Sequence, residues 1–388
     1  MISYARPHGR AWKRLLGMGA AVTAVIIAVA ACSSGGSSSG GTSAAGIAWS
    51  HVTSAAEGGG MAALVKAAKA EGSLNLIAIP RTWANYGGLM DAFTKQYGIK
   101  ISVTNPEGSS QDALNACSQL KGTSRAPDDV EVGTSFAPVG ISDGLFAQYR
   151  VQSWAKIPAA EKDPQGRWTY DYAGLMSIGY NSADFRVPPT SFKSLLAPEY
   201  KNAVTLTGSP TSSGDAFGAV FAAALGNGGS VNDIQPGVSY FARLTKAGNF
   251  SPVESTPAGI ESGQIKLTIA WSFLNAQWSA VNSKWKVVVP SDGQYLGYYV
   301  QAVCSNSPHP AAARLWQEFM YSNTGQNLWI QGGVRPVLLQ SMVAARTVDH
   351  AAYKALPAPS GTPKFANAAQ QAVAQGYVDK TWSSAVGS

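Results

Sequence analysis

The residue types that most often carry out catalysis or hold metals are scarce and scattered in this sequence. Two of its four histidines precede the expected fold, so no histidine cluster can be built from His8, His51, His309 and His350. No nucleophile elbow or phosphate-binding glycine motif occurs, and the Ser-x-x-Lys spacing at residues 118–121 lacks the companion motifs of penicillin-binding enzymes. We therefore expect no catalytic residue, no metal and no cofactor.

Residue types that bind small molecules without reacting are better placed. Thr211, Ser212 and Ser213 precede an apolar helix whose free N–H groups and positive dipole end favour a neutral or anionic acceptor. Plain N-capping accounts for one of these hydroxyls, and Asp215 is expected to serve the helix. Trp271 ends a strand, where its ring can give van der Waals contact or hold a cation; its alternative role is core packing.

Strands and helices alternate around these residues. In the first part, the patterns predict strands at 74–79, 99–103 and 129–132 and helices at 61–71, 86–97 and 111–121. This βαβαβ order implies a mostly parallel sheet covered on both faces, whose ligands sit beyond the carboxyl ends of its strands. The loops after residues 79, 103 and 132 are therefore the expected binding loops.

A second set of elements begins after a strand-like run at 175–180. Its predicted members are strands 203–207, 265–271 and 286–289 and helices 214–225 and 238–247. A strand at 298–303 then returns to the first set and is followed by helices at 311–321 and 364–377. We expect a discontinuous first lobe, 61–175 with 297–388, and a second lobe, 176–296.

The beginning of the chain predicts export and anchoring. Basic residues precede an apolar run that ends in Val29-Ala30-Ala31-Cys32, which resembles a lipobox, so residues 1–31 are expected to be a lipoprotein signal peptide and Cys32 its lipidation site. A Ser/Gly-rich tether at 32–60 would follow. The formal charge is +7, and the signal carries four positive charges, which weakens any nucleic-acid role. Cys117 and Cys304 can form a disulfide or stay separate thiols.

Several strings resemble landmarks of the extracellular solute-binding proteins of ABC importers, in the group that binds polyamines, ferric iron, thiamine and aminoethylphosphonate. They include 71–76 (EGSLNL), 83–86 (WANY), 128–132 (DDVEV), 177–181 (SIGYN) and 195–201 (LLAPEYK). The resemblance implies a two-lobed α/β fold of the type II periplasmic-binding-protein class, with a solute in the cleft between the lobes. It also implies hinge closure and delivery to permease subunits with an ATPase.

The resemblance also suggests where this chain contacts its solute. Trp83, Asn85 and Tyr86 resemble the polyamine binders' ligand segment, although Tyr86 can instead pack the cleft rim. Thr134 and Ser135 stand where relatives place a hydrogen-bonding hydroxyl, with helix capping as the alternative. Relatives often carry a stacking aromatic where this chain has Trp271. Asn275 is a further expected contact. Tyr295, Tyr298 and Tyr299 lie on the return segment, where alternate residues of a strand face the cleft, and of these we expect contacts from Tyr295 and Tyr299.

Departures from the group limit the solute. Polyamine binders place carboxylates where this chain has Thr211 to Gly214 and Tyr299, and without them a buried ammonium loses charge-assisted hydrogen bonds. Iron binders use paired tyrosines where this chain has residues 271–275. We expect a polar organic solute, with a polyamine as the alternative, bound by a monomer that is lipid-anchored on the outer face of the cell membrane. A sensory or adhesive lipoprotein of the same fold is the alternative role.

Overall fold

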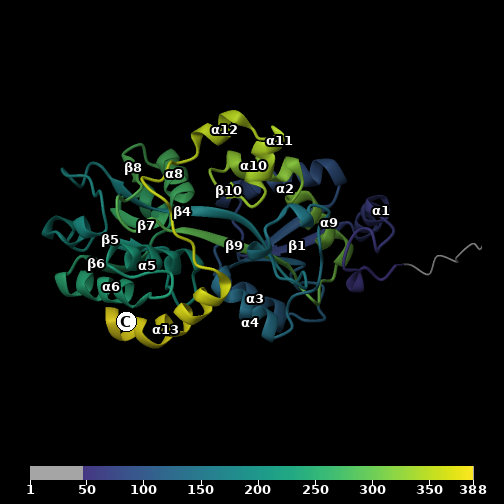
Figure 1. The fold of residues 1–388 in the computed structure, drawn as a ribbon, viewed down its shortest axis with the longest axis horizontal. Helices are drawn as coiled ribbons and strands as arrows, with labels where there is room; N and C mark the ends of the chain where they lie inside the picture. Colours follow the sequence, from purple (N-terminus) through teal and green to yellow (C-terminus); the bar gives the residue numbers. More distant parts are fainter. Residues whose placement is uncertain (1–46, 388) are drawn as a thin grey trace, which may run out of the picture. The chain divides into compact units, whose positions relative to one another are not determined.

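The first strands and helices follow one another as predicted in the computed structural model, which describes residues 47–387 (Figure 1). The elements are α1 (Met61–Glu71), β1 (Ser73–Ile77), α2 (Tyr86–Tyr97), β2 (Lys100–Thr104), α3 (Ser110–Gln119) and β3 (Asp129–Gly133). Strands β1 and β2 pair in parallel, with Ser73 opposite Lys100. Helix α1 ends at Gly72, whose φ of 69° lies in the left-handed region that glycine tolerates. The predicted βαβαβ order is confirmed.

The main sheet is mixed rather than mostly parallel, so that expectation is wrong. Its order is β3-β9-β4-β7-β5-β6, and β8 and β10 also pair with β4. The strands are β4 (Thr169–Asn181), β5 (Val204–Leu206), β6 (Phe250–Glu254), β7 (Leu267–Trp271), β8 (Trp285–Val288), β9 (Leu296–Val303) and β10 (Arg335–Pro336). Strand β5 runs parallel to β6 and β7, whereas β9 runs antiparallel to both β3 and β4. The antiparallel pairs arise because β4 and β9 leave and re-enter the first set of elements.

Strand β4 connects the two predicted lobes without a break. Its residues from Thr169 to Leu175 pair with β9, and those from Met176 to Tyr180 pair with β7. Every residue of β4 is buried. The strand begins at Thr169, before the predicted run at 175–180, because its first half pairs with β9, a partner that the local sequence does not specify.

The remaining helices surround these strands. They are α4 (Ala137–Ser142), α5 (Gly214–Gly226), α6 (Gln235–Ala247), α7 (Pro257–Glu261), α8 (Ser272–Val281), α9 (Pro310–Met320), α10 (Asn323–Gln331), α11 (Leu339–Ala345), α12 (His350–Ala355) and α13 (Ala368–Val386). The predicted closing helix is shifted toward the C-terminus, since Asn367 starts α13 with a capping box to Gln370. No helix among residues 47–387 is long and apolar enough to cross a membrane.

The predicted tether is too long at its C-terminal end. Trp49, Val52 and Ala55 are buried, and the Arg314 guanidinium of α9 donates to the carbonyl oxygen of Val52 at 2.8 Å. Residues 47–60 therefore belong to the folded chain, because three apolar side chains in this stretch find a buried position. The predicted signal, the lipidation site Cys32 and residues 32–46 lie outside the described residues.

The two cysteines of the described chain lie together. Cys117 in α3 and Cys304 just after β9 are joined as a disulfide, with their Cα atoms 6.2 Å apart. That separation lies within the range that a bridge requires. The link ties α3 to the end of β9 across a large separation in sequence.

Candidate ligand-binding site

A small cavity lies where the carboxyl end of β3 meets the start of α5. Its volume is about 10 Å³, and four of its lining residues were expected ligand contacts: Thr134, Ser135, Trp271 and Tyr295. The other lining residues are Gly133, Gly214, Phe217, Gly218, Gly297, Tyr298 and Gln371. Residues from distant parts of the sequence thus converge at one place, and a solute larger than a water would enter only after these elements separate.

Trp271 fills the space beside this cavity. Its side chain is buried, its Nε1–H donates to the Tyr299 hydroxyl at 2.9 Å, and its ring stacks on Tyr295 at a centroid distance of 6.4 Å. A Cβ atom on Gly218 or Gly297 would come within 2.6 or 2.3 Å of the indole. Glycine at these positions is what makes room for the ring.

The hydroxyls of Thr134 and Ser135 differ in their partners. Thr134 Oγ1 donates to the Tyr298 carbonyl at 2.8 Å, which fixes the 3-10 turn at 134–136 to β9. Ser135 Oγ is buried and has no hydrogen-bond partner among the described residues. An unpaired buried hydroxyl costs roughly 1–3 kcal/mol, so Ser135 is the hydroxyl of the two that a polar solute group would stabilise.

The start of α5 is less suited to an anion than the sequence predicts. Ser213 caps the helix through Ala216 N–H, while the Thr211 and Ser212 hydroxyls bond within their own loop to Ser209. Of this segment only Gly214 lines the cavity. Asp215 is buried in the first turn of α5, and its side chain accepts a hydrogen bond from the backbone N–H of Trp271. Burial raises the pKa of Asp215 to about 7. The ionised carboxylate of Asp215 would repel a solute anion at the start of α5.

Two glycines touch across the predicted lobe boundary. A Cβ on Gly214, at the start of α5, would lie 3.0 Å from the Cα of Gly133, and the converse distance is also 3.0 Å. Backbone meets backbone at this point, so neither partner can move aside as a flexible side chain would. The contact sets how closely the start of α5 approaches the end of β3.

We expect Gly214→Ala to keep these two elements apart. The added methyl group would hold them a few tenths of an ångström further apart and lower the affinity for solute roughly tenfold, about 1.4 kcal/mol. Small-angle scattering and titration calorimetry would test this, with Gly376→Ala as control because nothing lies within 4 Å of a Cβ there. An affinity unchanged in Gly214→Ala would show that the contact does not limit closure.

Trp83 and Tyr86 belong to a second, buried group built around Glu131 of β3. The Trp83 Nε1–H donates to Glu131 Oε1 at 3.2 Å, and the Tyr172 hydroxyl donates to the same oxygen. Tyr86 accepts a hydrogen bond from Gln301 of β9 through its hydroxyl oxygen. Burial raises the pKa of Glu131 to about 7, although hydrogen bonds from the surrounding rings oppose that rise.

A second carboxylate lies close behind Glu131. Asp171 of β4 accepts from the Gln301 amide at 3.0 Å and is fully buried. Burial, followed by the charge of Glu131, raises the pKa of Asp171 well above its ordinary value. No Lys or Arg side chain within residues 47–387 forms an ion pair with Glu131 or Asp171. Two acidic groups are therefore enclosed without a basic partner.

Aromatic rings join this acidic group to the small cavity. Trp83 meets Phe273 edge-on at 5.3 Å and Tyr299 at 5.5 Å, and Tyr299 in turn bonds Trp271. The rings of Trp83, Tyr299 and Trp271 therefore form a continuous path. Trp83 and Tyr299 belong to the first predicted lobe and Trp271 to the second.

The two asparagines predicted as contacts bond elsewhere. The Asn85 amide donates to the Leu328 carbonyl of α10 at 2.7 Å. Asn275 is fully buried, donates to Ser177 Oγ at 2.9 Å and accepts from the Trp285 indole at 3.2 Å. Both side chains use these groups to hold helices in place.

The sequence interpretation overlooked Glu131, Asp171, Tyr172 and Gln301. The sequence did contain a signal for Glu131, because a carboxylate in the middle of a predicted buried strand needs a compensating partner. Asp171 and Tyr172 fell outside the predicted strands, since β4 was expected to begin only after them.

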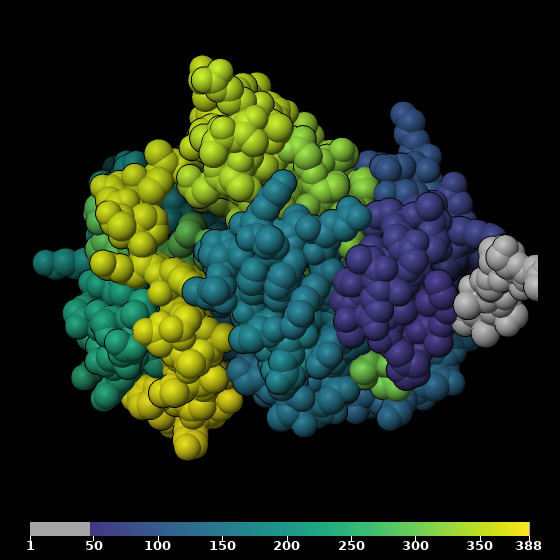
Figure 2. All heavy atoms as spheres, turned by 45° about the vertical axis from the view of Figure 1, so that its right-hand side comes forward, coloured from purple at the N-terminus to yellow at the C-terminus, as the bar shows by residue number. Residues whose placement is uncertain are grey.

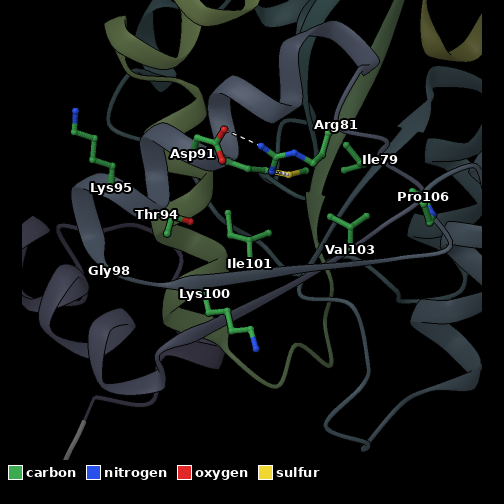
Figure 3. A pocket seen from close by; sticks show the side chains of 11 residues that line it. Ile79, Arg81, Asp91, Thr94, Lys95, Gly98, Lys100, Ile101, Val103 and Pro106 are labelled. Atoms are coloured by element: carbon green, nitrogen blue, oxygen red, sulfur yellow. Dashed lines mark hydrogen bonds and ion pairs between the residues drawn. The ribbon is translucent and has the colours of Figure 1, made fainter.

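A larger hollow of about 770 Å³ lies apart from the predicted residues, between α2 and the open edge of β2. Ile101 and Val103 point from β2 toward the ion pair of Arg81 with Asp91 (Figure 3). It contains none of the expected ligand contacts and no convergence of distant segments, so size alone does not make it the solute site.

Comparison with known proteins identifies the family. Residues 130–358 match the family model described as bacterial extracellular solute-binding protein. This chain belongs to that family. Family membership places the protein outside the cytoplasm as the solute-binding component of a bacterial ABC transporter, with permease subunits as partners. The family and the fold are those of binding proteins rather than enzymes.

Solved structures of two-lobed periplasmic binding proteins share the fold. AgtB from A. tumefaciens R10, in complex with agropinic acid, has a TM-score of 0.65 and 15% identity, covering 81% of this chain and 99% of its own. A putative spermidine/putrescine ABC transporter protein from Listeria monocytogenes has a TM-score of 0.57 and 13% identity, and the match covers 80% of this chain and 98% of the Listeria chain. Iron-bound HitA from Pseudomonas aeruginosa has a TM-score of 0.56 and 17% identity, and the match covers 79% of this chain and 98% of HitA. These similarities establish the type II binding-protein fold.

Proposed function

We propose that this solute-binding protein captures a small organic cation, such as an amine, in the cleft between its lobes. The observation that carries the proposal is the pair of buried carboxylates, Glu131 and Asp171, without a basic partner. An isolated buried carboxylate is costly unless it is paired or protonated. A solute ammonium near Glu131 would supply the missing charge and allow the carboxylate to ionise.

The aromatic rings around this carboxylate support the same charge preference. Trp83 donates a hydrogen bond to Glu131, and Tyr299 and Trp271 continue from Trp83 toward the small cavity. A cation held over such rings gains about 0.5–2 kcal/mol, depending on how fully it is desolvated. Asp215 at the start of α5 adds a third acidic group and disfavours an anionic solute.

This proposal revises the argument against a polyamine. Carboxylates are missing at residues 211–214 and 299, where polyamine binders place them, but Glu131 offers one from β3 instead. A solute amine would thus be held from the first predicted lobe. The match to the Listeria spermidine/putrescine protein in fold is compatible with such a solute.

The anchor, the oligomeric state and the lobe boundaries are also proposals. We infer that Cys32 carries the lipid that holds the protein at the outer face of the membrane. We further propose that the protein acts as a monomer, with lobe boundaries near residues 175 and 297. Intact-mass measurement of the membrane fraction would detect the diacylglyceryl group, and its absence from Cys32 would contradict the anchor.

A solute screen tests the charge preference directly. Spermidine, putrescine, a sugar phosphate and ferric citrate would each be added to purified protein, and the melting temperature measured. A solute bound only by the folded state raises that temperature, by an amount set by its concentration relative to Kd. We expect a shift with the amines only, and a shift with the sugar phosphate alone would contradict a cationic solute.

A further inference from the structure

The C-terminal helix α13 lies across the mouth of the cleft. In sequence it falls within the first predicted lobe, but it packs against α6 of the second predicted lobe as well as against the 3-10 turn 134–136 and α4 of the first. Figure 1 shows α13 running between α6 and the α3–α4 region, and in Figure 2 the yellow C-terminal residues lie between green and blue segments. The helix thus touches both sides of the cleft.

The contacts of α13 with the two sides differ in kind. On the second lobe, Trp382 packs edge-on against Phe241 at 5.2 Å and Phe250 at 6.1 Å. The Gln375 amide donates to the Pro210 carbonyl at 3.0 Å, and Gln370 donates to Asn232 at 2.7 Å. No side-chain hydrogen bond joins α13 to the turn 134–136 or to α4 within the described chain.

The segment before α13 passes the start of β9, the strand that runs between the two predicted lobes. Lys364 N–H donates to the Gln294 carbonyl at 2.8 Å, and Leu296 N–H donates to the Lys364 carbonyl at 2.9 Å. These bonds lie just before β9, next to Tyr295 of the cavity wall. These bonds hold the segment before α13 at the start of β9, which runs from the second predicted lobe to the first.

One residue of α13 reaches the cavity itself. Gln371 lines it together with Ser135 and Trp271, and its amide nitrogen donates to the Ala366 carbonyl at 2.8 Å. Its side-chain oxygen accepts no hydrogen bond from the rest of the described chain. An acceptor oxygen at this place matches the N–H donors of an ammonium group.

We propose that α13 is a movable wall of the solute cleft: it stays on the second lobe, closes against the turn 134–136, and presents the Gln371 oxygen to the solute. The assignment of Gln371 rests on the proposed amine solute, whereas the movement of the helix does not. Because the aromatic contacts and the side-chain hydrogen bonds of α13 go to the second lobe, opening separates α13 from the turn and leaves its contacts with α6 intact.

Spin labels measure the movement without any solute. Val373 on α13, Asp143 after α4 and Lys246 on α6 are exposed, so cysteines there would accept labels. In solute-free protein we expect a broad or bimodal distance between labels at 373 and 143 and a single narrow distance between 373 and 246. A narrow first distance with a broad second one, or two narrow distances, would overturn the movable wall.

Gln371→Ala tests the contact with solute. With spermidine as the probe, we expect its dissociation rate to rise about tenfold, measured at a temperature where the variant is folded, because loss of the bond to the Ala366 carbonyl also lowers the melting temperature of the free protein. Lys380→Ala, exposed on the same helix, is the matched control and should dissociate at the wild-type rate. Equal rates in Gln371→Ala and wild type would remove Gln371 from the site. Absence of spermidine binding in wild type would overturn the proposed solute and the Gln371 contact with it, while the label distances would still decide the helix movement.

Discussion

Glu131→Gln is expected to weaken spermidine binding at least tenfold at pH 8, about 1.4 kcal/mol or more. Wild-type Glu131 would supply a charge-assisted hydrogen bond to a solute ammonium, typically worth about 1.5–3 kcal/mol. The amide of glutamine keeps the shape of the side chain and can still accept from Trp83 and Tyr172. The loss of spermidine affinity therefore measures the contribution of the negative charge rather than that of side-chain packing. Titration calorimetry gives the affinity directly.

The same substitution should reduce a pH dependence. Burial raises the pKa of Glu131 to about 7, so the carboxyl group of the free protein is mostly neutral at pH 6 and mostly ionised at pH 8. A cation binds the ionised form, and wild-type affinity should rise across this range. In Glu131→Gln the affinity should rise less, because only Asp215, whose pKa burial also raises to about 7, then ionises beside the cavity. An equal rise in affinity in wild type and Glu131→Gln would contradict the role of Glu131.

Stability should change with pH in the opposite direction. A carboxyl group whose pKa is raised on folding stabilises the native state below its unfolded pKa, and this contribution is lost as the pH rises through the folded value. The ordinary value is 4.5 and the folded value about 7. Solute-free wild type should thus lose melting temperature between pH 5 and pH 8, more than Glu131→Gln does.

A buried carboxylate away from the cleft provides the control. Glu318 of α9 accepts from the Tyr149 hydroxyl at 2.8 Å and from the Gln152 N–H, and its pKa is also raised by burial. Glu318→Gln should alter the stability of the protein while leaving spermidine affinity and its pH dependence as in wild type. A loss of affinity equal to that of Glu131→Gln would mean that both act only through the fold.

The sequence predicts the fold well where local signals and global topology agree. Gly72 and Gly98 stop helices in the left-handed conformation, and Asn367 caps α13, all from residue types that favour those positions. Strand direction was predicted wrongly because β4 and β9 pair across large separations in sequence, which no local pattern specifies. Their antiparallel pairing follows from the path of the chain between lobes.

The site was predictable only in part for a similar reason. Thr134, Ser135, Trp271 and Tyr295 stand at the ends of strands, where α/β folds bind ligands, and the structure brings them together. Asn275 stands near Trp271 in sequence but points into the interior of the second lobe, because one helical turn redirects its side chain. The position of Glu131 in a buried strand was visible in the sequence, but only the three-dimensional packing shows that no basic residue accompanies it.

Trp271→Ala is expected to lower the free energy of unfolding by about 3–5 kcal/mol, because it removes a large buried ring and leaves a cavity. The indole lies against Gly174, Gly218 and Gly297, which have no side chains to fill the vacated space. Loss of the Nε1–H bond also leaves the buried Tyr299 hydroxyl without its donor. Because the ring is buried beside the cavity, we expect a change in both stability and solute binding. Denaturant unfolding at low temperature measures the first effect.

Trp285→Ala separates the two roles of Trp271. Trp285 is also almost fully buried, but its indole bonds Asn275 and packs against Trp278 away from the cavity. We expect a similar loss of stability in both variants, and a loss of spermidine affinity of tenfold or more only in Trp271→Ala, measured where both proteins are folded. Trp271→Phe should recover part of the affinity, since a phenyl ring retains an aromatic face for the cation. Equal affinities in Trp271→Ala and Trp285→Ala would assign Trp271 to the core alone, and the acidic group around Glu131 would then have to hold the solute without it.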